Sequence, residues 1–287
     1  MSRDDEGLSL VNFVHAGETR PYYLYVPAAA GPAPAPLLLE LHGRGIDPVR
    51  FDRMTGFRAA AGQHGFVLAL PTATGETWND GRNPRGETRD DVTYLLAVID
   101  DVRKRTPIDE RRVYAAGMSN GATMTGRLAC EQPGQLAAIA QVAGTAATAV
   151  VERTRPSRPV PVINIHGAAD LYAPYTGGNR RGLRARILIP RPWRPAIGVD
   201  DWAHFWVAAN RATDGPHLHA LPPDTSARTW HGDTPSSDIT FYRIDRAGHT
   251  WPGSTTPLPR LLVGRTSHTI DATRLIWDFL ANHTRDN

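Results

Sequence analysis

The sequence has one cysteine, one lysine and no long apolar run, and each scarcity excludes a class of protein. Cys130 stands alone among 287 residues, so no disulfide can form within the chain. A chain without disulfides fits a reducing compartment. No stretch approaches the ~18 consecutive apolar residues that a membrane-spanning helix needs. We therefore expect neither an internal cross-link nor a membrane partner.

The sequence also has little excess of one charge over the other, since the formal net charge is only +3. A nucleic-acid partner is not expected, because binding to phosphates requires a strongly basic surface. Lys104 is the only lysine, and arginine supplies the other positive charges, a bias typical of GC-rich genomes. Residues 1–6 are mostly polar and acidic, and no apolar signal segment follows them. As written, the sequence predicts a cytoplasmic location, or a secreted one if an export signal has been removed.

Short apolar runs alternate with segments of helical spacing along most of the chain. Strands that alternate with helices form parallel βαβ units, whose sheet is covered on both faces. The sequence thus predicts an α/β fold with a mostly parallel central sheet, in one domain over residues 1–287. Residues 172–234 give the weakest pattern. The expected strands are 8–15, 22–26, 37–41, 66–70, 112–117, 136–142, 160–165 and 239–244, and the expected helices are 51–64, 91–105, 121–131, 200–212 and 271–283.

The segment Gly117-Met118-Ser119-Asn120-Gly121 is a G-x-S-x-G motif between an expected strand and an expected helix. In that context the motif forms a tight turn that lifts the serine hydroxyl above the sheet. A side chain at position 117 or 121 would crowd the turn. Ser119 would lie at a helix N-terminus, where unpaired N–H groups favour a developing anion. We interpret Ser119 as a nucleophile, and the alternative is an ordinary Gly/Ser turn.

A serine hydroxyl needs a base to accept its proton, and in this arrangement an acid and then a histidine follow the serine along the chain. Asp170 is the candidate acid, because it lies just beyond the strand that ends at Ile165. The alternative is a turn or helix-cap aspartate. His249 is the candidate base, because it follows the last strand through Gly248. Other histidines after Asp170 stand in polar segments and are expected on the surface: His217, His219, His231 and His268.

The segment Leu41-His42-Gly43-Arg44-Gly45 follows the first core strand. A loop in this place supplies one backbone donor to an oxyanion hole, and the residue after the nucleophile supplies the other. We assign these donors to Arg44 and Asn120, and the alternative is a plain glycine turn. Trp78 and Trp251 are candidate substrate-binding residues that would line an aromatic pocket, unless they only pack. His42 joins them as a candidate that would orient the loop.

Four motifs in order carry a family resemblance: L-H-G at 41–43, G-M-S-N-G at 117–121, H-G-A-A-D at 166–170 and G-H-T-W-P-G at 248–253. Over roughly residues 20–283 the chain resembles the polyhydroxybutyrate depolymerase and feruloyl esterase group, including its lipoprotein-like bacterial esterases. Trp78-Asn79 and Asp90-Asp91-Val92 are similar to further parts of that pattern. The resemblance implies an α/β-hydrolase fold, a Ser119–His249–Asp170 triad, no cofactor, and ester substrates from polyesters to hydroxycinnamoyl and acetylated sugars.

The chain departs from this family in three places. It lacks the disulfide that many exported relatives carry, and Arg44 stands where relatives usually have a small or uncharged residue. An arginine-rich insertion at about 175–200 follows Asp170, and we interpret it as a lid or rim, or as solvated arginines paired with the protein's own carboxylates. A polymer-binding domain is not evident. The insertion's arginines are Arg180, Arg181, Arg184, Arg186, Arg191 and Arg194.

The leading prediction is a serine carboxylic ester hydrolase that acts on a small or polymeric ester. An acyltransferase would use the same three residues, with an alcohol as acceptor in place of water. A binding protein on a degenerate hydrolase scaffold is the alternative from another class, and the intact Ser119, Asp170 and His249 disfavour it. No histidine pair has zinc-binding spacing such as H-E-x-x-H, so we expect no metal.

Overall fold

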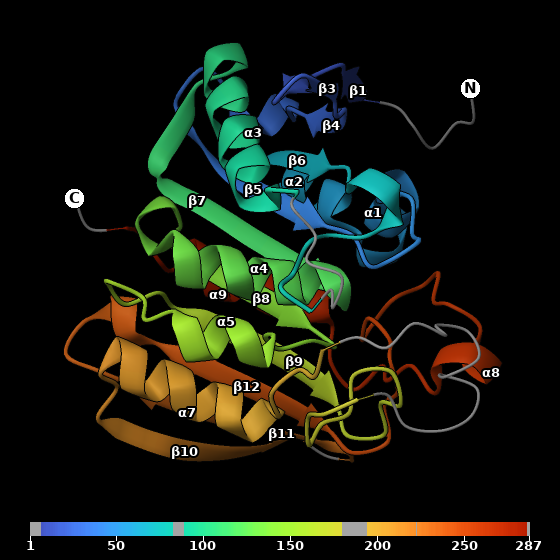
Figure 1. The fold of residues 1–287 in the computed structure, drawn as a ribbon, viewed down its shortest axis with the longest axis vertical. Coiled ribbons are helices and arrows are strands. Elements are labelled where there is room, and N and C mark those ends of the chain that lie inside the picture. The colour runs from blue at the N-terminus through green and yellow to red at the C-terminus, as the bar shows by residue number, and fades with distance from the viewer. Residues whose placement is uncertain (1–6, 83–88, 180–193, 222, 286–287) are drawn as a thin grey trace.

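A ten-stranded sheet forms the centre of the computed structural model, which describes residues 7–82, 89–179, 194–221 and 223–285 (Figure 1). The short hairpin of β2 (Val14–His15) and β3 (Glu18–Thr19) lies outside it. The order across the sheet is β1 (Leu8–Val11), β4 (Tyr22–Tyr25), β6 (Val67–Pro71), β5 (Ala35–Leu41), β7 (Ile108–Met118), β8 (Ala138–Val142), β9 (Val162–Gly167), β12 (Ile239–Ile244), β11 (Thr225–His231) and β10 (Asp214–Leu221).

The six central strands, from β6 to β12, run parallel, and antiparallel pairs extend the sheet at both edges. Every residue of β5, β6, β8 and β9 is buried. Strands buried on both faces are typical of parallel sheets covered by helices. The predicted α/β-hydrolase architecture, a mostly parallel sheet with helices on both faces, is confirmed.

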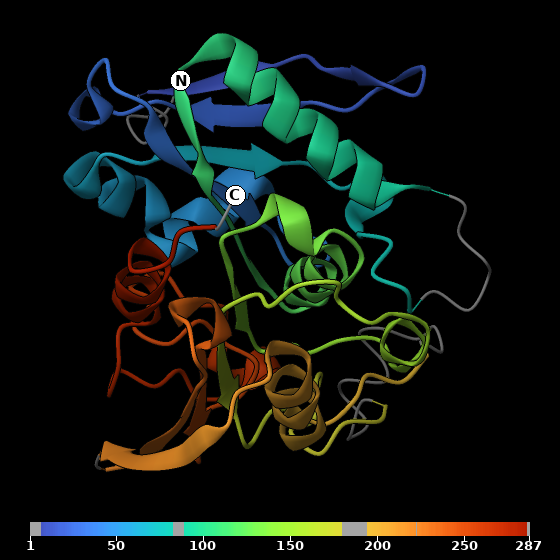
Figure 2. The same cartoon turned by 90° about the vertical axis from the view of Figure 1, so that its left-hand side faces the viewer.

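Helices cover both faces of the sheet, as the edge-on view in Figure 2 shows. Alternate side chains of β5 enter the two cores: Leu37, Leu39 and Leu41 pack on one face, and Leu38 packs on the other. The first face carries α3 (Asp91–Arg105), α4 (Asn120–Glu131), α5 (Thr148–Arg153) and α7 (Val199–Asn210), and the second carries α1 (Pro48–Thr55), α2 (Phe57–His64) and α9 (Ala272–Ala281).

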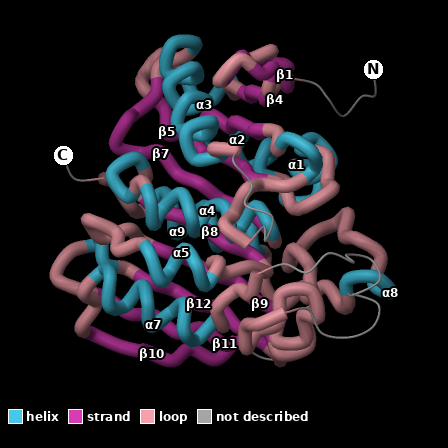
Figure 3. Tube along the Cα trace, in the orientation of Figure 1, coloured by secondary structure: helices cyan, strands magenta, loops and turns pink. Residues whose placement is uncertain are grey.

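Short elements complete the described chain. They are α8 (Arg260–Val263) and the 3₁₀ turns η1 (Ala28–Ala30), η2 (Thr74–Glu76), η3 (Pro133–Gln135) and η4 (Pro235–Ser237). Figure 3 shows long loops gathered beside α8, at one end of the parallel strands. The segments after β5, β7, β9 and β12 all begin at the carboxyl ends of these strands. This is where open α/β sheets place their sites.

The structure corrects two expectations about elements. Residues 51–64 do not form one helix, because Gly56 adopts a left-handed conformation (φ 77°) that ends α1 and begins α2. The hairpin of β10 and β11 is not among the expected elements, because β10 lies in the segment of weakest pattern and every one of its residues is exposed, so no buried face marks the strand. In the insertion at 175–200, residues 180–193 lie outside the described part of the chain. No described helix is long and apolar enough to cross a bilayer.

Candidate active site

Ser119 lies at the sharp turn from β7 into α4. Its backbone has φ 58° and ψ −118°, a conformation that non-glycine residues rarely adopt. The Ser119 N–H donates to Val142 O of the neighbouring strand at 2.9 Å, which fixes the turn against the sheet. Ser119 is the N-cap residue of α4, yet its side chain makes no capping hydrogen bond. The hydroxyl therefore remains available at the positive end of the helix.

The two glycines of the motif are required by space. A Cβ on Gly121 would lie 2.0 Å from Leu41 O and 2.6 Å from His42 O. A Cβ on Gly117 would lie 2.6 Å from the carbonyl carbon of Gly121. Real Cβ atoms do not approach backbone atoms this closely, so the α4 N-terminus can lie against the end of β5 only when position 121 is glycine.

Asp170 and His249 form a buried pair at the ends of β9 and β12. His249 Nδ1 lies 2.7 Å from Asp170 Oδ2. The other carboxylate oxygen, Oδ1, accepts hydrogen bonds from the backbone N–H groups of Tyr172 and Ala173 at 2.8 and 2.9 Å. These contacts fix the carboxylate, and an ionised Asp170 requires the proton on Nδ1 of a neutral His249. The second ring nitrogen, Nε2, is then the basic one.

Two further side chains surround this pair. His166 Nε2 donates to Ala173 O at 2.8 Å and lies 3.8 Å from Asp170 Oδ2. Burial lowers the pKa of the His166 imidazole, so this side chain holds the loop as a neutral group. The Tyr172 ring lies 5.3 Å from the His249 ring, and its hydroxyl donates to Leu262 O at 3.0 Å. Tyr172 therefore packs against His249 on the pocket side.

The loop after β5 lies directly against the nucleophile turn, since a Cβ on Gly43 would lie 3.6 Å from Ser119 Cβ. His42 fixes this loop: Nε2 accepts the N–H of Ala73 at 3.1 Å, and Nδ1 donates to Gly43 O at 2.9 Å. That pattern requires the neutral tautomer with the proton on Nδ1. Burial lowers the pKa of His42, against the opposing effect of the Gly43 hydrogen bond.

Asn120 connects the nucleophile turn to the loop at residues 72–82. Its Oδ1 accepts the Trp78 N–H at 2.7 Å, and its Nδ2 donates to Asp80 Oδ2 at 2.6 Å. Its backbone N–H is the first of α4, so it has no partner within the helix. The Trp78 indole N–H donates to His42 O at 2.9 Å. The two loops that flank Ser119 are thus joined to each other.

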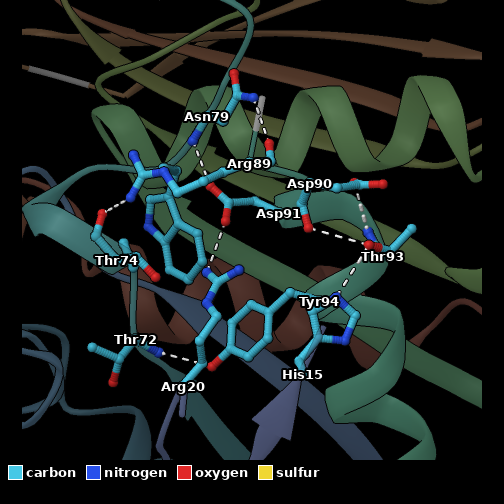
Figure 4. Close-up of polar contacts among 12 residues, drawn as sticks. His15, Arg20, Thr72, Thr74, Asn79, Arg89, Asp90, Asp91, Thr93 and Tyr94 are labelled. Atoms are coloured by element: carbon cyan, nitrogen blue, oxygen red, sulfur yellow. Dashed lines mark hydrogen bonds and ion pairs between the residues drawn. The ribbon is translucent and has the colours of Figure 1, made fainter. Parts of the chain in front are cut away.

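A buried polar network holds the loop at residues 72–82 in place (Figure 4). Arg20 Nη2 lies 2.7 Å from Asp91 Oδ1 at the start of α3, and the Asn79 N–H donates to Asp91 Oδ2 at 2.5 Å. The Arg20 guanidinium lies 3.6 Å from the ring centroid of Tyr94. The segments Trp78-Asn79 and Asp90-Asp91-Val92 are therefore in contact. The first belongs to the loop beside Ser119, and the second anchors that loop.

One pocket contains Ser119, Asn120 and His249 in its lining. Ser119 and His249 make no hydrogen bond in this structure, although such contacts are often loose in unliganded enzymes. Among the described residues, no group of three or more His, Cys, Asp or Glu side chains is placed to hold a metal ion. The other lining residues are Arg44, Arg82, Ala143, Tyr172, Ala173, Gly178, Asn179 and Arg194.

Trp78 and Trp251, the two candidates for an aromatic pocket, lie outside this lining, so the structure favours the alternative that they pack. Trp251 is 1% exposed and packs edge-on against Phe51 and Phe57 in the core. Trp78 is buried and joins the two loops through its indole N–H, and His42 is buried and fixes the loop after β5, which is the role expected of it. Sequence reasoning missed the pocket roles of Tyr172 and Arg82. The position of Tyr172, two residues after Asp170, is the only sequence signal that could have indicated either residue.

Comparison with known proteins places this chain in a family. The family model "Esterase PHB depolymerase" matches residues 20–179, more than half of the chain. NocK of Nocardia uniformis subsp. tsuyamanensis, which is designated an esterase, is 32% identical over 278 residues, covering 93% of this chain and 80% of NocK. Feruloyl esterase B of Piromyces equi is 29% identical over 225 residues, covering 76% of this chain, and the chain spans 40% of that protein.

A solved structure agrees with the fold. The acetyl xylan esterase from Aspergillus awamori superposes with a TM-score of 0.63 over 96% of this chain and 98% of that one, at 13% identity. At this identity the likeness concerns the fold alone. The family match and the identity to NocK together show that the chain belongs to the PHB depolymerase family of esterases and is a carboxylic ester hydrolase.

Proposed function

We propose that the protein hydrolyses esters through an acyl-enzyme formed on Ser119. Nε2 of His249 accepts the hydroxyl proton while Ser119 Oγ bonds to the ester carbonyl carbon. The C–O bond to the alcohol then breaks, and the alcohol leaves with the proton from His249. Water attacks the acyl-enzyme with the same histidine as base, and the acid product leaves Ser119 protonated again.

Asp170 has a positioning role in this proposal. Its contact with His249 Nδ1 at 2.7 Å supports the tautomer that presents a basic Nε2 and stabilises the imidazolium formed during each step. The backbone N–H contacts to its other oxygen keep the carboxylate from turning away. The observation that carries the proposal is that His249, held by the buried Asp170, and the strained Ser119 turn line one pocket.

The oxyanion would be stabilised by the backbone N–H groups of Arg44 and Asn120. The helix start supports the role of Asn120, and the contact of Gly43 with the Ser119 turn supports that of Arg44. Donors of this kind act on charge that appears only in the transition state, and losing one costs about 3 kcal/mol in a studied protease.

A labelling experiment tests the nucleophile. A fluorophosphonate probe should modify the wild-type protein once, and peptide mass spectrometry should find the added mass on Ser119. Ser119→Ala should abolish labelling and the turnover of 4-nitrophenyl acetate. Ser226→Ala, an exposed serine on β11, is the matched control and should retain both. Labelling of another residue, or turnover by S119A protein free of wild type, would refute the proposal.

The substrate class is proposed from the names of relatives, which include feruloyl esterases and a poly(3-hydroxyalkanoate) depolymerase. We propose that the substrate is a feruloyl-type or polyester-type acyl ester, either small or polymeric. A screen of 4-nitrophenyl esters by chain length, methyl ferulate and a polyester film would show which acyl group reaches Ser119. Loss of every activity in the S119A protein would assign them all to this site.

A further inference from the structure

The pocket above Ser119 has an unusual charge. Three arginines, Arg44, Arg82 and Arg194, lie in its lining together with Ser119 and His249. The described lining contains no aspartate or glutamate. A neutral acyl group gains little from three guanidinium groups, and like charges gathered in one cleft repel each other unless an anion joins them.

Arg82 is held in place by a buried carboxylate. Its Nε and Nη2 donate to Asp80 Oδ2 at 2.9 and 2.6 Å, and the Asp80 side chain has no exposed surface. Asp80 also accepts the Arg82 N–H at 3.0 Å and the Asn120 amide at 2.6 Å. The guanidinium is therefore oriented before any ligand arrives, which reduces the entropy lost on binding.

Arg194 lies beside Arg82, because its N–H donates to Arg82 O at 2.8 Å. The residues that follow are fixed to the protein: Ile197 N donates to Ala146 O at 3.0 Å, and Gly178 N donates to Ala196 O at 2.9 Å. The Arg194 residue itself is exposed. The described lining therefore places three guanidinium groups and no carboxylate next to the nucleophile, and Arg82 among them is oriented by the buried Asp80 behind the lining.

We propose that this pocket selects esters that carry a second, ionised carboxylate, which Arg82 and Arg194 bind while the ester carbonyl lies at Ser119. Arginine suits this role because its planar group donates two parallel hydrogen bonds to a carboxylate. Arg44 adds positive charge from the opposite loop. This inference rests on the proposed function at Ser119, and it names the substrate class of that site.

The test compares esters that differ only in charge. Mono-4-nitrophenyl adipate, suberate and sebacate carry an ionised carboxylate at about pH 7, and their 4-nitrophenyl methyl diesters do not. Wild-type protein should favour the acid over its methyl ester by about tenfold in kcat/KM at one chain length or more, as expected for a charge-assisted contact. Added salt should reduce the preference. Equal kcat/KM for acid and diester at all three lengths would overturn the inference.

Arg194→Gln is the informative variant, because it removes charge without leaving Asp80 unpaired. It should raise KM for the acid severalfold and change KM for the diester far less, so that the preference for the acid shrinks. The control is Arg111→Gln, with the same loss of charge near the opposite end of β7, and it should leave the preference intact. Equal effects of R194Q on both substrates would also overturn the inference.

Binding separates this inference from the proposed function. In the S119A protein, calorimetry should find tighter binding of monomethyl adipate than of dimethyl adipate, even if neither ester is a good substrate. No difference between the two would refute the carboxylate site alone. Conversely, Ser119-dependent turnover of neutral esters without an acid preference would retain the proposed function and discard the inference.

Discussion

Ser119 occupies a helix N-cap position without capping the helix. Three other helices, α1, α3 and α9, begin with Asp47, Asp90 and Asp271, and each carboxylate accepts a backbone N–H of its own helix. Such caps stabilise a protein by about 1 kcal/mol. Ser119 forgoes this contact and adopts a positive φ, which costs about 1–3 kcal/mol. A local loss of stability of this kind is typical of functional sites.

Asp170→Asn tests the positioning role at the residue scale. The amide keeps the size of the carboxylate but does not stabilise the imidazolium, and it favours the wrong tautomer of His249. We expect kcat for 4-nitrophenyl acetate to fall by several orders of magnitude, as about 10⁴-fold is known for the same change in a serine protease. Asp214→Asn, on an exposed edge strand, is the control and should be neutral. A fall of less than about tenfold would contradict the role.

At the scale of elements, the G-x-S-x-G turn depends on close contact between α4 and the end of β5. Gly121→Ala would place a methyl group 2.0 Å from Leu41 O, so backbone must move. We expect a loss of several kcal/mol in the free energy of unfolding, at the high end for a single substitution, and loss of fluorophosphonate labelling. Urea unfolding measures the first effect.

Gly134→Ala is the matched control, because a Cβ on Gly134 meets no atom within 4 Å. Its φ is not in the left-handed region, so the substitution should change stability by less than about 1 kcal/mol. If G121A proved as stable and as reactive as G134A, the structural reason given for the motif would be wrong.

Elements with strong patterns could be predicted from the sequence, and those without could not. The helix expected at 91–105 is α3, because a capping aspartate and an apolar stripe define it. Strand β10 buries none of its residues, so its short alternation of apolar residues and histidines marks no core-facing side. Gly56 divided a helix that periodicity alone would continue.

The same limit applies to the site. The motif chemistry of Ser119 indicated where the chain turns, and Arg194 belongs to the insertion interpreted as a lid or rim. The pocket wall at Arg82 comes from a loop that only the folded chain brings to the site. Trp251 shows the converse: it follows the candidate base by two residues, yet its side chain turns into the core between Phe51 and Phe57. Closeness in sequence does not determine which way a loop residue points.

At the scale of the whole molecule, the parallel sheet explains why distant segments share one pocket. Ser119 follows β7, Asp170 follows β9 and His249 lies beyond β12, and His249 contacts Asp170 across 79 residues of sequence. Parallel strands place their carboxyl ends at one edge, so residues after different strands converge there. The core behind that edge must hold the strands in register, so that these residues stay aligned.

That core contains a buried carboxyl pair on the α1 and α2 face. Glu40 of β5 accepts the Thr55 hydroxyl at 2.6 Å, and Asp52 pairs with Arg58 through Nε at 3.2 Å and through its N–H at 2.9 Å. Burial raises the pKa of Glu40 well above its ordinary value, and the charge of Asp52 adds to the effect. Because the positive charge of Arg58 stabilises the ionised form of Asp52, we place the single proton of this carboxyl pair on Glu40.

Glu40→Gln should therefore change how stability depends on pH. The folded protein keeps a proton on Glu40 that the unfolded chain loses near pH 4.3, so stability falls as pH rises from that value toward the raised pKa, by up to about 1.4 kcal/mol per pH unit. Glutamine cannot titrate but can still accept the Thr55 hydroxyl, so this loss should disappear. Urea unfolding at a series of pH values should show E40Q gaining on wild type as pH rises, whereas Glu131→Gln, on the partly exposed surface of α4, should follow the wild-type curve. Parallel curves for wild type and E40Q would show that Glu40 is ionised in the folded protein.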